Sequence, residues 1–284
     1  MSRILLTGAG GMLGRDLQTV LAGRDVTALT RAELDVTDLD AVLEASAGHD
    51  VIINASAYTK VDDAETHEDD AHAVNAIGPS NLAAAAAQHD SRLVTVSTDY
   101  VFAGDASSPY PEDAPIEPKN AYGRTKAEGE RLALSAHPDG TYIVRTAWLY
   151  GEHGPNFAST MLRLASERET LTVVDDQVGQ PTWTLDLARQ IVALVDSDAP
   201  AGAYHGTNAG QVSWFGFARE IFRLSGLDPE RVQPTDSASF VRPAARPSYS
   251  VLGHDAWARA GLSPMRDWRE AIADALESGV ARRS

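Results

Sequence analysis

A tyrosine and a lysine four residues apart are the side chains whose spacing points most directly to chemistry. Tyr122 and Lys126 occupy positions i and i+4 of an expected helix, so they share one face. A phenol has an unperturbed pKa of about 10, and a neighbouring ammonium group lowers it by stabilising the phenolate. The pair therefore predicts a proton donor for a ketone oxygen that gains charge on hydride transfer. Taken alone, the pattern also fits a chance surface pair.

A strand with hydroxyls at its end supplies a second part of this chemistry. Residues 94–100 read Val-Thr-Val-Ser-Thr-Asp-Tyr, and ligands bind at the carboxyl edge of parallel sheets. We expect Thr98 to hydrogen-bond a substrate carbonyl, with Ser97 and Asp99 as near alternatives. Because side chains alternate between the two faces of a strand, at least one of Ser97 and Asp99 should point away from the substrate. We also expect Asp99 and Tyr100 to contact the substrate. The alternative is a simple capping turn.

A glycine-rich turn opens the chain between an expected strand and an expected helix. Such a turn presents backbone N–H groups and the positive end of a helix dipole to a pyrophosphate. Its spacing, with two residues between successive key glycines, differs from the GxGxxG form. The order strand, turn, helix nevertheless favours nucleotide binding over a structural turn. The expected cofactor contacts are Gly8, Gly10, Gly11, Met12, Leu13 and Gly14.

The end of the second expected strand bears on the choice between NADPH and NADH. An acidic residue there would bind the ribose 2′-hydroxyl and repel a 2′-phosphate, but this chain has Leu29-Thr30-Arg31. Because Arg31 can pair with the phosphate, we predict a preference for NADPH. If Arg31 is only a surface arginine, NADH is the alternative. Asp35 and Val36 follow where an adenine edge is expected.

The first 150 residues alternate between short β-rich runs and helical segments, which predicts a Rossmann-type, doubly wound parallel α/β sheet. We expect residues 1–150 to form a dinucleotide-binding domain, joined by about 182–210. A smaller, discontinuous substrate-binding domain takes 151–284, mainly 151–181 and 211–284. The expected strands are 3–7, 25–29, 51–54, 92–97, 141–146 and 203–207. The expected helices are 12–22, 38–47, 69–88, 122–135, 156–167, 184–196 and 267–277.

Two segments of the second half are expected to be irregular, 175–183 and the proline-broken loop 234–247. Between them, the aromatic side chains from Trp214 to Phe222 lie on an expected helix and are read as core more than as a base-stacking platform. Arg242 and Arg246 stand out in an acidic chain, because their spacing suits one anion and arginine matches phosphate geometry. Surface arginines beside prolines are the alternative.

The composition of the chain argues against several classes of function. The chain has 284 residues and a net charge of −16, which disfavours nonspecific binding to nucleic acid or to anionic membranes. Cysteine is absent, so disulfides, thiolate catalysis and cysteine-ligated zinc are excluded. No run is long enough to cross a membrane or to act as a secretory signal, so we expect a cytoplasmic protein.

These motifs together resemble the extended short-chain dehydrogenase/reductases and, among them, the dTDP-4-dehydrorhamnose reductase family. The strings Ser97-Thr98-Asp99-Tyr100-Val101-Phe102 and Asp176-Gln177-x-Gly179-x-Pro181-Thr182 are the most discriminating. The match also includes Thr7-Gly8, Gly11 to Arg15, Asn54 to Thr59, Val61-Asp62, Ala64-Glu65, Val74-Asn75, Tyr122-Gly123-x-x-Lys126, Arg145-Thr146-x-Trp148-x-Tyr150-Gly151, Asn156-Phe157 and Arg246-Pro247.

The resemblance implies that NAD(P)H reduces the C4 keto group of dTDP-4-dehydro-L-rhamnose, with Thr98, Tyr122 and Lys126 as the catalytic triad. Tyr122 and Lys126 would also contact the cofactor. The rest of the cofactor wall would comprise Asn54, Ala55, Ala57, Tyr58 and Asn75. Trp148 would line the sugar pocket, although it also fits a core role. The other expected substrate contacts are Asn156, whose place at a helix start suits a phosphate, Gln177 and Arg246.

One departure from the family concerns metal. Better-known members pair through a magnesium ion held by glutamates of two subunits, but those positions fall at Asp16 and at or beside Leu185 here. Because leucine cannot ligate magnesium, we expect no metal site and doubt a magnesium-bridged dimer, while a homodimer of another kind stays open.

Three other functions fit the same motifs. The first is a ketoreductase for another dTDP-linked deoxysugar of antibiotic synthesis, since only the pocket shape would differ. The second is a non-catalytic, NADP-binding regulatory subunit of this fold, which the intact triad argues against. The third is a sugar epimerase or dehydratase, for which Asp99 beside Thr98 is a partial match.

Overall fold

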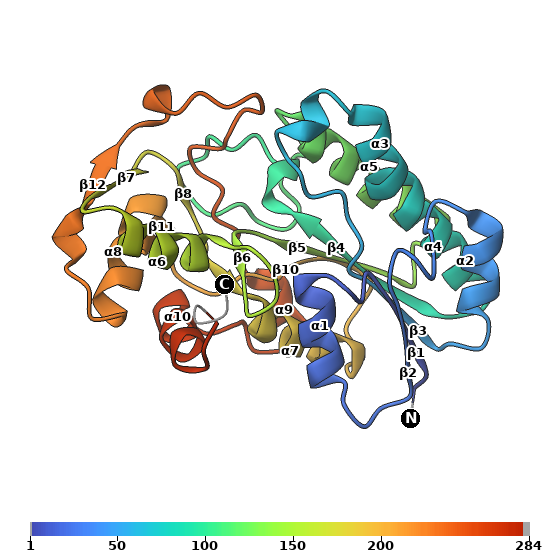
Figure 1. The fold of residues 1–284 in the computed structure, drawn as a ribbon. Coiled ribbons are helices and arrows are strands. Elements are labelled where there is room, and N and C mark those ends of the chain that lie inside the picture. Colours follow the sequence, from blue (N-terminus) through green and yellow to red (C-terminus); the bar gives the residue numbers. More distant parts are fainter. Residues whose placement is uncertain (1, 281–284) are drawn as a thin grey trace.

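Six parallel strands form the central sheet of the protein, whose computed structural model describes residues 2–280 (Figure 1). The strand order is β10-β5-β4-β3-β1-β2, so the chain reverses direction across the sheet at β1. In open sheets of this kind ligands bind beyond the carboxyl ends of the strands at such a switch point. The strands are β1 (Ile4–Thr7), β2 (Val26–Leu29), β3 (Val51–Asn54), β4 (Arg92–Thr98), β5 (Thr141–Thr146) and β10 (Gly202–His205).

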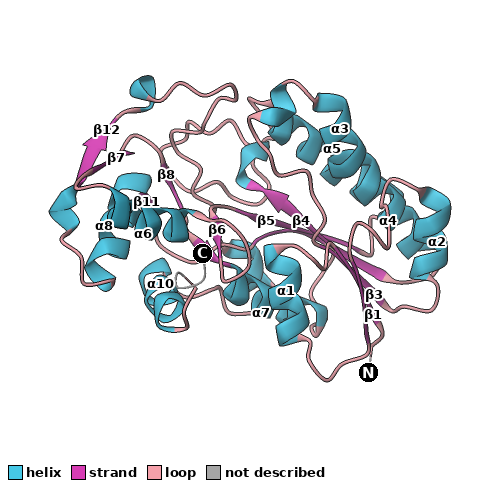
Figure 2. Cartoon of the chain, viewed as in Figure 1, coloured by secondary structure: helices cyan, strands magenta, loops and turns pink. Residues whose placement is uncertain are grey.

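Helices cover both faces of this sheet, as Figure 2 shows. Alternate residues of β1 point to opposite faces: Ile4 and Leu6 join one hydrophobic cluster and Leu5 joins another. The first cluster includes α1 (Met12–Val20) and α7 (Thr184–Val195), and the second includes α2 (Leu39–Ser46) and α4 (Gly78–Gln88). The buried apolar strands thus explain why an all-parallel sheet forms, and the predicted Rossmann-type architecture is confirmed.

The expected helix at 69–88 is three segments: α3 (Glu68–His72), a π-helical turn at Ala73–Ile77, and α4. Pro79, which has no N–H to donate, lies in the first turn of α4 directly after this π-helical turn. The adjacent α5 (Ala121–Ala136) begins at Asn120, whose side chain accepts a hydrogen bond from the N–H of Gly123 at 2.8 Å. This cap fixes the first turn of the helix that carries Tyr122.

A second cluster of apolar side chains lies among α6 (Phe157–Glu167), α8 (Trp214–Leu224) and α10 (Trp268–Glu277). Beside it, β7 (Leu171–Val174) pairs in parallel with β12 (Val232–Thr235), well away from the central sheet in Figure 1. The sequence patterns predicted neither strand, because β7 followed a helix without a turn signal and β12 overlaps the expected loop. The short helix α9 (Asp255–Arg259), which buries Trp257, was also missed.

Four two-residue strands form two further small sheets. The segment 175–183, expected to be irregular, contains β8 (Val178–Gly179), which pairs with β11 (Val212–Ser213), and β9 (Thr182–Trp183), which pairs with β6 (Leu149–Tyr150). Through α7 and β10 the chain returns to the central sheet, as predicted from sequence. Across residues 2–280, no helix combines the length and apolarity that spanning a membrane would require.

Candidate active site

Close backbone packing accounts for the glycines that follow β1. Gly8 has φ +73°, and a Cβ there would lie 2.5 Å from the carbonyl carbon of Ala55. A Cβ on Gly14 would lie 2.2 Å from the carbonyl oxygen of Gly8, so only glycine lets α1 start against the turn. Gly11 caps α1 without a side-chain acceptor, which leaves the first amides of the helix available to an anion.

A cavity of about 560 Å³ opens beside this turn. The predicted cofactor residues that line it are Gly8, Gly10, Gly11, Arg31, Asp35, Val36, Ala55, Ala57 and Tyr58. Thr30, Ser56, Thr59 and the exposed Lys60 line it as well, although none of them was predicted to contact the cofactor. Lys60 thus adds a second cation to the wall that contains Arg31.

Two predicted cofactor residues lie behind the wall. Asn54 is fully buried, accepts a hydrogen bond from Thr7 Oγ1 at 2.8 Å and donates to Thr95 Oγ1 at 3.0 Å. Asn75 accepts from the N–H of Tyr58 at 2.8 Å and donates to its carbonyl oxygen at 3.1 Å. Asn54 also accepts from the N–H of Ser56 at 3.0 Å, so both asparagines position the cavity wall through its backbone. Met12, Leu13 and Gly14 form the first turn of α1 beneath it.

The three expected catalytic residues converge where β4 ends and α5 begins. Thr98 donates a hydrogen bond from Oγ1 to Asp99 Oδ1 at 2.9 Å, and the same oxygen accepts one from the N–H of Tyr100 at 3.3 Å. Its hydroxyl is also hydrogen-bonded to Tyr122, which packs against the same small cluster of buried alanines as Tyr58 of the cofactor cavity. One turn along α5, buried Lys126 donates from Nζ to the carbonyl oxygen of Val96 at 2.6 Å.

The structure corrects the expected acidity of Tyr122. Burial, and to a smaller extent the charge of Asp99, raise the pKa of this phenol to about 12, and only the hydrogen bond with Thr98 opposes them. The ammonium group of Lys126 is engaged by Val96 instead, and burial lowers its own pKa to about 8 against the opposing pull of Glu130. Tyr122 is thus a firmly protonated donor, because desolvation and the charge of Asp99 both favour the neutral phenol.

Asp99 is the third perturbed group of this cluster. Its side chain is 2% exposed, and burial raises the pKa of its carboxyl to about 6, opposed by the hydroxyls of Ser250 and Thr98 and by backbone N–H groups. Tyr100, the other residue predicted to contact substrate here, meets the ring of Tyr122 edge-on at 5.6 Å between centroids.

A buried ion pair supports Lys126 from one turn further along α5. Glu130 accepts hydrogen bonds from Arg145 Nε at 3.0 Å and Nη2 at 2.7 Å, and from Ser97 Oγ at 2.5 Å. Ser97, an alternative to Thr98 as a carbonyl ligand, is therefore turned away from the site. Arg145 was recognised only as part of a family string, and Glu130 was not predicted to belong to the site, although it stands at i+4 from Lys126.

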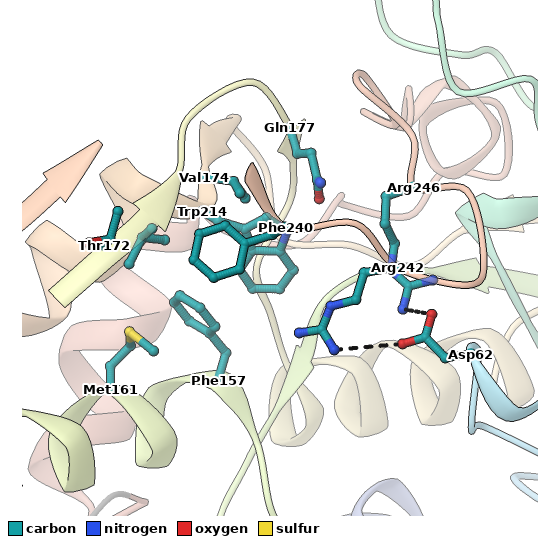
Figure 3. A pocket seen from close by; sticks show the side chains of 11 residues that line it. Asp62, Phe157, Met161, Thr172, Val174, Gln177, Trp214, Phe240, Arg242 and Arg246 are labelled. Atoms are coloured by element: carbon teal, nitrogen blue, oxygen red, sulfur yellow. Dashed lines mark ion pairs between the residues drawn. The ribbon is translucent and has the colours of Figure 1, made fainter. Parts of the chain in front are cut away.

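A second cavity, of about 340 Å³, is shown in Figure 3. One side is apolar and contains Phe157, Met161, Val174, Trp214 and Phe240. On the opposite side two arginines extend from the loop after Phe240 toward Asp62: Arg246 Nη2 lies 2.8 Å from Asp62 Oδ1, and Arg242 Nη1 lies 3.8 Å from Oδ2. Gln177 also lines the cavity and donates to Ser237 Oγ at 2.8 Å. Apolar rings facing cations suit a base joined to a phosphate.

Trp148 packs behind the apolar side of this second cavity, against Trp214. Its ring stacks on Trp214 with 3.6 Å between centroids, and its backbone has φ +47°, a conformation that costs a non-glycine residue energy. A Cβ on Gly179 would lie 2.6 Å from the Trp148 ring, so a glycine is needed behind it. Trp214 was expected in the core but lines the cavity, whereas Phe217 and Phe222 are buried as predicted.

Asn156 has a structural role instead of the expected phosphate contact. It caps α6, where its Oδ1 accepts from the N–H of Ser159 at 3.0 Å. Its Nδ2 donates to the carbonyl oxygens of Gly151 at 2.9 Å and Gly154 at 3.2 Å. Because both amide hydrogens are engaged by backbone, this side chain has no donor left for an anion.

The two positions discussed for magnesium are engaged in the fold. Asp16 is buried, accepts a hydrogen bond from Thr184 Oγ1 at 2.5 Å and lies 3.8 Å from His153 Nε2. Leu185 packs against the second hydrophobic cluster. Within residues 2–280, no group of three or more His, Cys, Asp or Glu side chains is arranged to hold a metal ion.

The chain is similar in sequence and fold to several known proteins. The family described as RmlD substrate binding domain matches residues 1–280. The dTDP-4-dehydrorhamnose reductase of Streptomyces griseus is 51% identical over 288 residues, covering 99% of this chain and 95% of the relative. The dTDP-4-keto-6-deoxy-D-glucose reductase of Streptomyces niveus is also 51% identical, over 278 residues and 96% of each chain. A solved dTDP-4-dehydrorhamnose reductase from Bacillus anthracis, in complex with NADP, has a TM-score of 0.93 and 39% identity, covering 98% of this chain and 99% of that one.

Proposed function

This chain belongs to the RmlD family, and from that premise we propose that it reduces the C4 keto group of dTDP-4-dehydro-L-rhamnose to the alcohol with NADPH. The observation that carries the proposal is that Thr98, Tyr122 and Lys126 come together where β4 ends and α5 begins, with Tyr122 packed against the same alanine cluster as Tyr58 of the cofactor cavity. NADPH, when bound, supplies the hydride. Arg31 and the N-terminus of α1 are the groups that would hold its phosphates.

The residues of this chain have separate tasks in the reduction. The Thr98 hydroxyl orients the keto oxygen by hydrogen bonding. Tyr122 keeps its proton at neutral pH, because its pKa is about 12, and gives it up once the oxygen has become an alkoxide, which is a stronger base than a phenolate. The buried ammonium of Lys126 holds positive charge beside the reacting atoms and is fixed in place by Val96. The substrate's diphosphate would meet Arg242 and Arg246.

The test is NADPH oxidation by the purified protein with enzymatically prepared dTDP-4-dehydro-L-rhamnose, with the product identified by NMR. Tyr122→Phe removes only the proton donor, so turnover should fall by about 10²- to 10⁴-fold while NADPH affinity is unchanged. A variant that turns over normally would contradict the proposal, and a native protein that binds NADPH but reduces no keto-sugar would favour a regulatory subunit.

A second substrate is favoured by one specific finding. The Streptomyces niveus relative, a dTDP-4-keto-6-deoxy-D-glucose reductase, is as similar to this chain as the Streptomyces griseus dTDP-4-dehydrorhamnose reductase. A panel of the two 4-keto sugars separates these possibilities through kcat/KM. Net NADPH consumption with either sugar would exclude an epimerase or dehydratase, which returns the hydride within one cycle. The two-domain division, cytoplasmic location and homodimer without magnesium stay predictions.

A further inference from the structure

The substrate cavity already contains an anion that belongs to the protein. Asp62 Oδ1 lies 2.8 Å from Arg246 Nη2 and accepts a hydrogen bond from the N–H of Ala244 at 3.3 Å, while Oδ2 lies 3.8 Å from Arg242 Nη1. In Figure 3 the carboxylate points between the two guanidinium groups, and all three side chains line the cavity. The ion pairs thus span the space where the arginines would meet a ligand.

The two arginines are held to different degrees. The Arg246 side chain is 21% exposed and makes the short contact, whereas that of Arg242 is 60% exposed and lies at the limit of an ion pair. Two guanidinium groups against one carboxylate leave this wall with an excess positive charge. A diphosphate offers more negative charge and more acceptor oxygens than one carboxylate, and arginine binds such oxygens in pairs.

The position of Asp62 in the chain links the two cavities. The segment Ala55 to Lys60 lines the cofactor cavity, and Asp62 follows it directly on the substrate side. The loop carrying the arginines is also attached to the catalytic helix, because Asn120 at the start of α5 donates to the carbonyl oxygen of Ala245 at 2.9 Å. The arginine loop is therefore held against both the cofactor segment and the helix of Tyr122.

We propose that Asp62 is an internal counter-anion, which holds Arg242 and Arg246 in the substrate cavity and yields them to the diphosphate of a nucleotide ligand. The inference rests on the proposed function, since it identifies how that substrate's diphosphate is bound. It makes Asp62 a specificity-determining residue that competes with phosphate. Its removal should therefore tighten the binding of phosphorylated ligands and leave uncharged nucleosides unaffected.

The experiment measures binding of dTDP and thymidine to the native protein and to Asp62→Asn by isothermal titration calorimetry. Asparagine keeps the shape and can still accept from Ala244. We expect dTDP to bind about three- to tenfold more tightly to the variant, because a negative charge beside the diphosphate is gone, and thymidine to bind equally. The matched control is Asp69→Asn, an exposed residue a few positions along the chain, which makes the same change in net charge and should alter neither ligand.

Arg246→Gln completes a double-mutant cycle. Alone it should weaken dTDP binding about tenfold or more, and in its presence Asp62→Asn should give a smaller gain than in the native protein. Unchanged or weaker dTDP binding to Asp62→Asn would overturn the counter-anion role while leaving the reductase proposal intact. Failure of the native protein to bind dTDP at all would overturn both.

Discussion

Replacing Glu130 by glutamine removes one charge from behind the active site and keeps the shape of the side chain. Glu130 and Arg145 form an ion pair whose side chains are each 6% exposed. The variant leaves the Arg145 guanidinium facing the carbonyl oxygen of Glu112 at 2.8 Å and His205 Nε2 at 3.3 Å, with no carboxylate to balance it. Breaking a buried pair in this way costs about 3–5 kcal/mol.

That loss is large against a total free energy of unfolding of about 5–15 kcal/mol. For a chain of this size, each kcal/mol lowers the melting temperature by about 2–4 °C, so Glu130→Gln should melt about 10 °C lower. The matched control is Glu128→Gln on the same helix. Glu128 pairs with Arg131 at 2.6 Å on the surface, where such pairs contribute about 0–1 kcal/mol.

The same substitution acts on catalysis through Lys126. Glu130 is the group that raises the pKa of Lys126 against the lowering by burial, so its neutralisation should shift that pKa further down. The alkaline fall in kcat/KM for NADPH oxidation should then begin at lower pH than in the native enzyme. Adding Arg145→Met to Glu130→Gln should restore much of the stability but not the pH profile.

Two assays therefore decide the role of Glu130: thermal denaturation, and kcat/KM measured from pH 6 to 10. If Glu130→Gln melts no lower than Glu128→Gln, the ion pair does not carry the stability assigned to it. If the variant is destabilised but its pH profile overlays that of the native enzyme, Glu130 is a purely structural residue.

Two further predictions concern charge in the cofactor and catalytic sites. Arg31→Ala should raise the KM for NADPH about tenfold, the equivalent of about 1.4 kcal/mol, and change that for NADH little, because only NADPH has a 2′-phosphate; steady-state kinetics with both cofactors that gave equal losses would contradict this. Because the pKa of Lys126 is about 8 in the folded protein and about 10.5 unfolded, native kcat/KM should fall above about pH 8. Lys126 affects the free energy of unfolding in the opposite direction. Burial of its ammonium group lowers that free energy below pH 8, and this penalty is relieved as the pH rises from 8 to 10.5. Urea denaturation across this range should therefore show a shrinking difference in free energy of unfolding between the native protein and Lys126→Met.

Local signals in the sequence were enough for much of the fold and the site. Apolar strands, helix caps and the glycine turn are read from neighbouring residues, and the structure confirms the sheet and places Gly8, Arg31 and Tyr58 on one cavity. The pairing of β7 with β12 joins segments far apart in the chain, so no local pattern marked it.

The errors within the site have the same origin. Asn156 reads as a ligand at a helix start, but its cap and its two backbone acceptors are visible only in three dimensions. The spacing of Tyr122 and Lys126 predicted a lowered phenol pKa, yet the depth of burial decided its direction. Glu130 carried a signal that was overlooked, since it continues the i, i+4 series from Tyr122 through Lys126.

The most direct measurement of the central claim follows the hydride itself. The protein is incubated with dTDP-4-dehydro-L-rhamnose and NADPH deuterated at C4 of the nicotinamide on the transferred face, and the sugar is analysed by NMR and mass spectrometry. We predict one deuterium per molecule at C4 of the sugar, in amounts equal to the NADP⁺ formed. A sugar without deuterium despite NADPH oxidation, or one labelled at another carbon, would contradict the assignment of this site as a C4 ketoreductase.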